Sequence, residues 1–162
     1  MDIVMLGARR RRLAPAIGAA GIIASGLALA PVVLADGGSV TRGPIYAFAA
    51  GASLELDGHA QMVRTADGKT IVTVRVAGLA PNTSYGAHVH QAACATGDAD
   101  GHYRFDPAGP AAPPNEIWPS FTTNEAGVGN GFAVADRSAG PTAVSVVVHA
   151  PGGAKIACAD LE

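Results

Sequence analysis

The chain has 162 residues, of which 49% are hydrophobic and 15% are charged, and its formal net charge is −2. This balance excludes a disordered chain, which would be poor in apolar residues and rich in charge. The length fits one domain, alone or with a targeting segment. No basic stripe remains once the run Arg9–Arg12 is set aside, which argues against nucleic acid as the main partner.

The first 35 residues have the pattern of a secretory signal peptide. The run Arg9–Arg12 precedes 22 uncharged residues, Leu13–Leu34, and Val33-Leu34-Ala35 gives small or modest side chains before a cleavage site at Asp36. An uncleaved membrane anchor is the alternative, because 22 uncharged residues are long enough to cross a bilayer core. Both interpretations predict export of a domain over residues 36–162, to the cell envelope or beyond. Cleavage would leave 127 residues with a formal charge of −5.

The expected domain contains two cysteines, Cys94 and Cys158. An even number of cysteines in an exported domain predicts one disulfide, with two free buried thiols as the alternative. The bond would close a loop of about 65 residues and stabilise the fold by about 4 kcal/mol on the chain-entropy model.

Short runs of alternating or β-branched residues, separated by turn sequences, follow Asp36. In the clearest run, residues 71–76, the three valines share one face and Ile71, Thr73 and Arg75 share the other. No segment has a helical period with caps. We therefore expect an all-β fold, an eight-stranded antiparallel Greek-key β-barrel or sandwich. The expected strands are 45–56 (one or two), 59–65, 71–76, 85–91, 116–123, 128–135, 142–149 and 155–160.

Residues 98–114 are rich in Asp, Gly, Pro and Ala and have almost no apolar periodicity. This composition predicts a long loop between the strands 85–91 and 116–123. Long loops in compact domains are commonly functional.

The histidines offer a candidate metal site. Residues i and i+2 of a strand project from the same face, so His88 and His90 would present two imidazoles side by side. Neutral imidazole is a common ligand of zinc and copper, and four nitrogen donors suit Cu(II). A solvated or hydrogen-bonded pair is the alternative interpretation of these two residues. The five histidines of the domain are His59, His88, His90, His102 and His149.

The surroundings of this pair resemble the Cu/Zn superoxide dismutase family. The resemblance covers roughly residues 70–160 and agrees in the order of the motifs, in their strand contexts and in the position of the last cysteine. It rests on Val76-Ala77-Gly78-Leu79, Gly86-Ala87-His88-Val89-His90, Cys94, Gly101-His102-Tyr103, Val147-Val148-His149 and Ile156-Ala157-Cys158.

The resemblance implies a ligand set and a disulfide. Cys94 and Cys158 match the intradomain disulfide, and His59 falls outside the pattern and is interpreted as a surface residue. The four histidines that match the copper-ligand positions are His88, His90, His102 and His149.

The chain departs from the family at the zinc site. There His102 would bridge copper to zinc, and two more histidines and an aspartate in the following loop would complete the zinc ligands. Residues 103–116 contain no histidine, so His102 and one carboxylate would fall short of the usual four ligands. We therefore expect copper as the cofactor and no zinc.

A second departure lies between His149 and Cys158. The family has a long charged loop here, which guides the anionic substrate, and then an arginine. This chain has a short segment, and Lys155 stands in place of the arginine, with the positive charge but without the bidentate fork. Both departures resemble the copper-only branch of the family, with an open copper site.

The resemblance implies an exported copper-dependent superoxide dismutase, which converts superoxide to dioxygen and hydrogen peroxide by cycling Cu(II) and Cu(I). The catalytic residues would be His102, which carries a proton, and Lys155. Lys155, with Arg104 as a second candidate, would supply a local positive patch in an acidic domain. Glu116 or Asp106 would support His102 through its other ring nitrogen, and Trp118 is interpreted as a core or barrel-surface residue. The alternatives are an envelope protein that sequesters or delivers copper, and a metal-free Greek-key scaffold.

Overall fold

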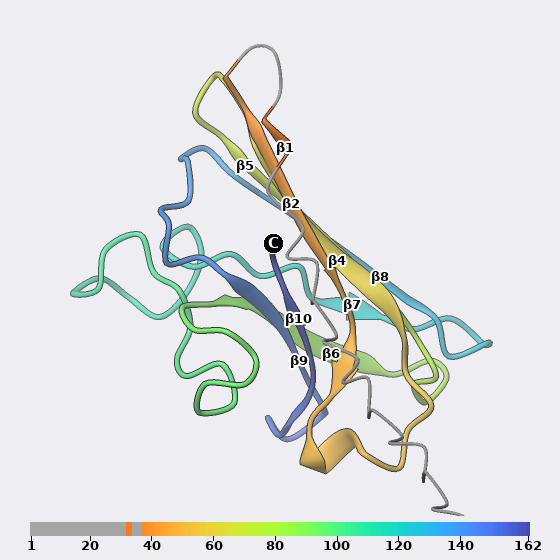
Figure 1. The fold of residues 1–162 in the computed structure, drawn as a ribbon. Coiled ribbons are helices and arrows are strands. Elements are labelled where there is room, and N and C mark those ends of the chain that lie inside the picture. Colours follow the sequence, from red (N-terminus) through yellow and green to blue (C-terminus); the bar gives the residue numbers. More distant parts are fainter. Residues whose placement is uncertain (1–31, 34–36) are drawn as a thin grey trace, which may run out of the picture.

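The computed structural model describes residues 32–33 and 37–162, which form two antiparallel β-sheets packed against each other (Figure 1). The described strands are β1 (Val32–Val33), β2 (Ser39–Pro44), β3 (Tyr46–Ala47), β4 (Asp57–Arg64), β5 (Thr70–Ala77), β6 (Ser84–His90), β7 (Phe121–Thr122), β8 (Gly129–Ala135), β9 (Ser145–His149) and β10 (Lys155–Asp160).

One sheet has the strand order β1-β2-β4-β5-β8, and the second has the order β3-β10-β9-β6-β7. The helical content of the described residues is one short 3-10 helix, η1 (Ala49–Gly51). The predicted all-β class with antiparallel pairing is therefore confirmed. The described residues contain no helix that is long and apolar enough to cross a membrane.

The strands follow the predicted pattern, with three differences. The described residues contain ten strands where eight were expected, because β1 and β2 were not predicted from the sequence. The strand expected over residues 45–56 is reduced to the two residues of β3, since local turn bonds, such as Gly51 N–H to Phe48 O at 2.9 Å, and η1 replace ladder pairing there. The strand expected over residues 116–123 is reduced to β7, since Pro119 has no backbone N–H to donate and only isolated bonds, such as Val89 N–H to Ile117 O at 3.0 Å, precede it. The predicted signal segment 1–35 lies outside the described residues, except for the backbone of β1, which pairs with β2.

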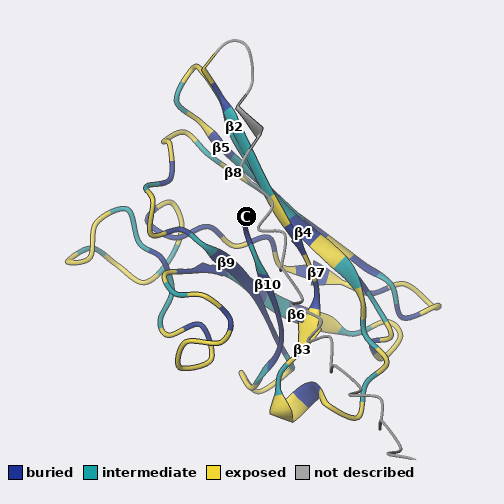
Figure 2. Ribbon diagram, in the orientation of Figure 1, coloured by how far each residue is buried: buried dark blue, intermediate teal, exposed yellow. Residues whose placement is uncertain are grey.

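The core lies between the two sheets and follows the alternation seen in the sequence. The three valines of β5 point inward and are at most 2% exposed, while Arg75 on its other face is exposed. They pack in one cluster with residues of β6 and β9, such as Val89 and Val146. Burial of these side chains is the main stabilising term of the fold. Figure 2 shows β9, the central strand of the second sheet, buried along its whole length.

The long loop predicted over residues 98–114 lies within the connection between β6 and β7, residues 91–120, which contains no named strand. One isolated bridge, between His90 and His102, brings this connection back to the end of β6. Gly131 of β8 lets this strand come close to the last residues of the connection. A Cβ at that position would lie 1.8 Å from the carbonyl oxygen of Pro119. The connection is thus held against both sheets.

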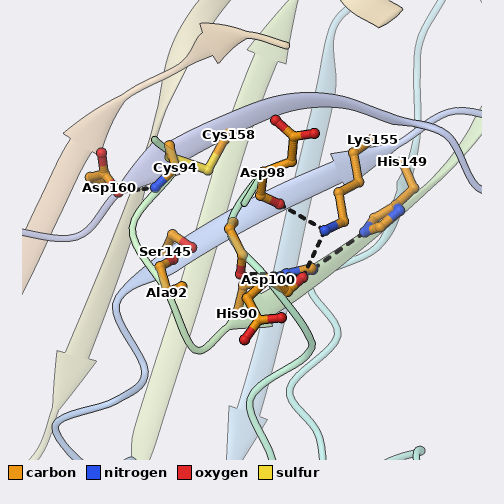
Figure 3. Close-up of a disulfide and its surroundings, with 11 residues drawn as sticks. His90, Ala92, Cys94, Asp98, Asp100, Ser145, His149, Lys155, Cys158 and Asp160 are labelled. Atoms are coloured by element: carbon orange, nitrogen blue, oxygen red, sulfur yellow. Dashed lines mark hydrogen bonds between the residues drawn. A yellow bond between two sulfur atoms is a disulfide. The ribbon is translucent and has the colours of Figure 1, made fainter. Parts of the chain in front are cut away.

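A disulfide joins the start of this connection to β10. Cys94 and Cys158 are bonded, with their Cα atoms 5.8 Å apart, which confirms the predicted pairing (Figure 3). The backbone N–H of Cys94 also donates to the carboxylate of Asp160 at 2.7 Å. The bond ties the connection to a strand whose Cys158 is fully buried.

We predict that replacing both cysteines by alanine lowers the free energy of unfolding by about 4 kcal/mol, because the unfolded chain regains the freedom of a loop of about 65 residues. Urea denaturation of the oxidised protein and of the Cys94→Ala/Cys158→Ala variant measures the difference. A loss below about 1 kcal/mol would show that the cross-link contributes little to the fold.

Candidate metal centre

Four histidines gather beside the second sheet. β6 and β9 pair with Gly86 opposite His149 and His88 opposite Val147, so this register brings the β6 histidines and His149 together. The bridge from the connecting segment adds His102. One ligand atom from each of His88, His90, His102 and His149 lies within 4.8 Å of the others.

The four predicted copper ligands are thus in one cluster. His59, in contrast, is exposed on β4 of the other sheet and is not part of the cluster, in agreement with its interpretation as a surface residue. Within the part of the chain that the structure describes, no second group of histidine, cysteine or acidic side chains is arranged to hold a metal ion.

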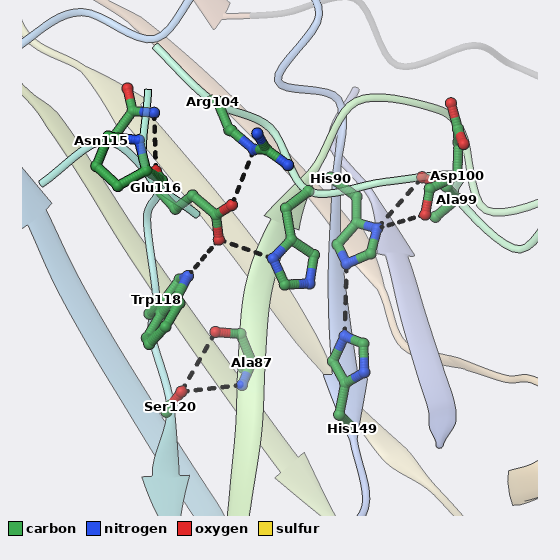
Figure 4. Close-up of polar contacts among 12 residues, drawn as sticks. Ala87, His90, Ala99, Asp100, Arg104, Asn115, Glu116, Trp118, Ser120 and His149 are labelled. Carbon is green, nitrogen blue, oxygen red and sulfur yellow. Dashed lines mark hydrogen bonds and ion pairs between the residues drawn. The ribbon is translucent and has the colours of Figure 1, made fainter. Parts of the chain in front are cut away.

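Backbone carbonyls orient two of the rings, and Figure 4 shows the contacts of one of them, His90. The Nδ1 atom of His90 lies 3.3 Å from Ala99 O and 3.2 Å from Asp100 O, and Nδ1 of His149 lies 3.0 Å from Gly153 O. Carbonyls only accept, so each Nδ1 carries the hydrogen and each Nε2 keeps its lone pair. The two Nε2 atoms lie 3.4 Å apart. Both lone pairs are therefore available to a ligand, as metal-binding histidines require.

A buried carboxylate orients the third ring. Glu116 Oε2 accepts a hydrogen bond from His102 Nδ1 at 2.7 Å, and its side chain is only 1% exposed (Figure 4). Of the two acids considered from the sequence, Glu116 makes this contact. Asp106 instead accepts from the backbone N–H of Ala108 at 2.9 Å and stabilises the loop.

Two further side chains surround Glu116. Trp118 donates from its indole Nε1 to Oε2 at 2.7 Å, and the Nε of Arg104 lies 3.2 Å from Oε1. The second contact is an ion pair without hydrogen-bond alignment, since Oε1 has no hydrogen-bond partner. The positive guanidinium and the indole N–H together balance a charge that would otherwise be costly to bury.

The fourth ring, His88, is packed among the others. Its centroid lies 4.1 Å from that of His102, 4.8 Å from that of His149 and 5.1 Å from that of Trp118. Its Nδ1 atom is buried and has no hydrogen-bond partner. An unpaired buried nitrogen costs free energy, and a metal ion would satisfy it, so the donor set fits a bound metal.

Burial favours the neutral form of three of the four imidazoles, those of His88, His90 and His149. Burial, with smaller contributions from the neighbouring His102, His149 and His90, lowers the pKa of His88 to about 3. Burial also lowers the pKa of His90 to about 4, with smaller contributions from His102 and Lys155. The pKa of His149 is lowered by burial as well, against the opposing effect of its bond to Gly153. Neutral imidazole is the form that binds metals.

Lys155 contacts the turn that supports His90. Its ammonium donates to Asp98 O and to Asp100 O, both at 2.7 Å (Figure 3). Asp98, Ala99 and Asp100 all have left-handed φ angles, of 52°, 65° and 50°, which turn their carbonyls toward these donors. Lys155 thus holds the turn whose carbonyls accept from His90.

Sequence reasoning did not identify Trp118 and the Arg104 ion pair as parts of the site. A signal for Trp118 was present, because residues i and i+2 of an extended segment share a face and Trp118 follows Glu116 by two. Arg104 lies two residues after His102, but its contact with Glu116 depends on how the connection between β6 and β7 folds back.

We predict that the metal-free protein loses stability as the pH falls from about 6.5 to about 3. The pKa values of His88 and His90 are lower in the folded protein than the 6.5 of an exposed histidine. The unfolded chain therefore binds more protons in this range, so stability is complete above about pH 6.5 and declines below it. Urea denaturation at a series of pH values measures the slope.

The control for this prediction is His59→Gln, which removes an exposed histidine and should leave the slope unchanged. The double variant His88→Gln/His90→Gln should have a flatter dependence. Equal slopes in all three proteins would contradict the assignment.

No protein-family model matches the sequence, and no curated protein matches it. Among solved structures, the Cu/Zn superoxide dismutase from Brucella abortus is similar, with a TM-score of 0.57 and 20% sequence identity over 76% of this chain and 99% of that chain. This chain therefore has the fold of a Cu/Zn superoxide dismutase, and its disulfide and four-histidine cluster bear out the resemblance seen in the sequence.

Proposed function

We propose that this protein is an exported copper-dependent superoxide dismutase, which converts superoxide to dioxygen and hydrogen peroxide. The observation that carries the proposal is the convergence of four imidazoles, three of which are positioned through the ring nitrogen that faces away from the cluster. Such outer contacts orient metal ligands and set their tautomers. The fold shared with a Cu/Zn superoxide dismutase supports the reaction class.

The donor set favours copper. The residues that would hold it are His88, His90, His102 and His149, four neutral nitrogen ligands of the kind that suits Cu(II). When bound, copper supplies the one-electron oxidation and reduction that dismutation needs.

His102 and Glu116 provide for the protons that form peroxide. The buried Glu116 carboxylate accepts from Nδ1 of His102 at 2.7 Å and so directs Nε2 of that ring toward the cluster. His102 is proposed to carry a proton on Nε2 whenever that atom is not a metal ligand, and to donate it to the reduced substrate. Lys155 is proposed to add positive charge near His90 and His149, since its charge contributes to lowering the pKa of both.

We further propose that the site works without zinc. In the family, zinc would bind the outer nitrogen of the bridging histidine, and here that nitrogen of His102 is hydrogen-bonded to Glu116. The absence of histidine from residues 103–116 supports the same interpretation. Glu116 then orients His102 in place of the metal.

Export and localisation in the cell envelope or outside the cell are part of the proposal. The disulfide fits an oxidising compartment, and the sequence 1–35 has the pattern of a signal peptide. An uncleaved segment would be the one expected contact with a membrane.

Copper sequestration without turnover is the second candidate. It is favoured by the charge of −5 expected for residues 36–162, which repels an anionic substrate. The short segment between His149 and Lys155 also leaves little room for a guiding loop.

We predict that the purified protein, offered copper and zinc together, binds one copper and no zinc per chain and consumes superoxide. His149→Ala should lose copper and at least about tenfold in rate, because one ligand is removed, and the exposed His59→Ala is the matched control. Metal analysis and pulse radiolysis measure both. Tight copper binding without turnover would favour sequestration, and no copper uptake would overturn both candidates.

We predict that Glu116→Gln weakens copper binding by about tenfold or more, because His102 loses the charged acceptor that orients it. Asp106→Asn, at the acid that does not contact His102, should leave the affinity unchanged. Competition titration against a copper chelator measures both constants. Equal affinities in the two variants would show that Glu116 does not position the ligand.

A further inference from the structure

We propose that Arg104 forms an anion-binding site at the entrance to His102, and that superoxide approaches the metal centre through it. The inference rests on the proposed function and assigns to Arg104 the direct contact with the anion. Three observations support it: a surface hollow beside His102, N–H donors of Arg104 that have no acceptor, and the two hydrogen bonds that already engage the Lys155 ammonium.

The hollow lies directly beside the metal centre. It has a volume of about 230 Å³ and is lined by Gln91, Gly101, His102, Arg104 and Pro107. Of the four histidines, His102 is the one that lines it. A small solute in the hollow would therefore be next to both a guanidinium and the ring proposed to carry the proton.

Arg104 is held in place and still has donors to offer. Its Nε lies 3.2 Å from Glu116 Oε1, and its Nη1 donates to Pro107 O at 3.2 Å. Nη2 has no hydrogen bond within the described residues, and 38% of the side chain is exposed. Because a guanidinium has five N–H donors in a rigid fork, the remaining donors are preorganised for an anion.

Lys155 offers less to an incoming anion. Two of the three N–H donors of its ammonium are used by Asp98 O and Asp100 O, at 2.7 Å each. It does not line the hollow. Lys155 therefore contributes its field and holds the turn, whereas Arg104 is the cation placed to contact the substrate.

The acidic groups near the hollow are already engaged. Glu116 is buried behind Arg104, and Asp100 Oδ2 accepts from the Gln91 side-chain amide at 3.1 Å. Their charges reduce the attraction of the hollow for anions. The exposed edge of Arg104 nevertheless gives the entrance a positive group in an otherwise acidic domain, which raises the local concentration of a small anion.

The test is azide binding to the copper-loaded full-length protein, followed by EPR and visible absorption of Cu(II) at low and high salt. Arg104→Gln should weaken azide binding by about fivefold at low salt, as expected for one partly exposed charge, and should flatten the salt dependence. Arg104→Lys should recover part of the loss. Arg75→Gln, which removes an exposed arginine from β5 in the other sheet, is the charge-matched control and should have little effect.

Lys155→Gln should weaken azide binding less than Arg104→Gln does. A larger effect at Lys155, or equal effects at Arg104 and Arg75, would overturn the proposal. A changed Cu(II) spectrum of Arg104→Gln without azide, not restored in Arg104→Lys, would also overturn it, because Arg104 would then act through structure alone.

Azide binding needs copper but no turnover, so the readout separates this inference from the proposed function. A protein that binds azide through Arg104 but does not consume superoxide refutes the dismutase proposal alone. Normal superoxide consumption with no azide effect in Arg104→Gln refutes this inference alone. If copper does not bind, both fail.

Discussion

The hydrogen bond between His102 and the buried Glu116 is the interaction on which the metal centre depends. Three of the four histidines are placed by the pairing of β6 with β9, but His102 lies on the long connection between β6 and β7 and needs its own restraint. The 2.7 Å bond to a carboxylate that is 1% exposed provides it. Trp118 and Arg104 hold that carboxylate in place, so the connection positions His102 as firmly as the strands position the other three histidines.

Backbone carbonyls orient His90 and His149, so the conformation of two loops sets the geometry of these ligands. The left-handed turn at Asp98–Asp100 directs carbonyls toward both His90 and Lys155, and the disulfide at Cys94 fixes the start of the same loop. His149 is oriented by the turn at Gly153. His90, His102 and His149 each have their hydrogen on the ring nitrogen that faces away from the cluster. Their Nε2 lone pairs are therefore available to a metal without prior rearrangement.

Much of this arrangement could be predicted from residue patterns, and the rest depends on contacts that no local pattern reveals. The period of two in the sequence of β5 predicted its buried valines. The resemblance to a known family predicted the four clustered histidines and the disulfide. The Trp118 and Arg104 contacts depend on the path of residues 91–120, a proline-rich and glycine-rich stretch without periodicity. The strand predicted over residues 116–123 was too long. Pro119 cannot donate to a strand ladder, and Gly131 of β8 lies close against its carbonyl, so regular pairing is interrupted there.

The central claim is that these four histidines hold copper while Glu116 takes the place of zinc. Crystals of the protein exposed to both metals, with anomalous scattering recorded at the copper and zinc absorption edges, test it directly. We expect one copper peak bonded to His88, His90, His102 and His149, with His102 Nδ1 still bonded to Glu116 and no zinc peak beside it. A zinc peak at Glu116, or copper bound away from these histidines, would refute this assignment.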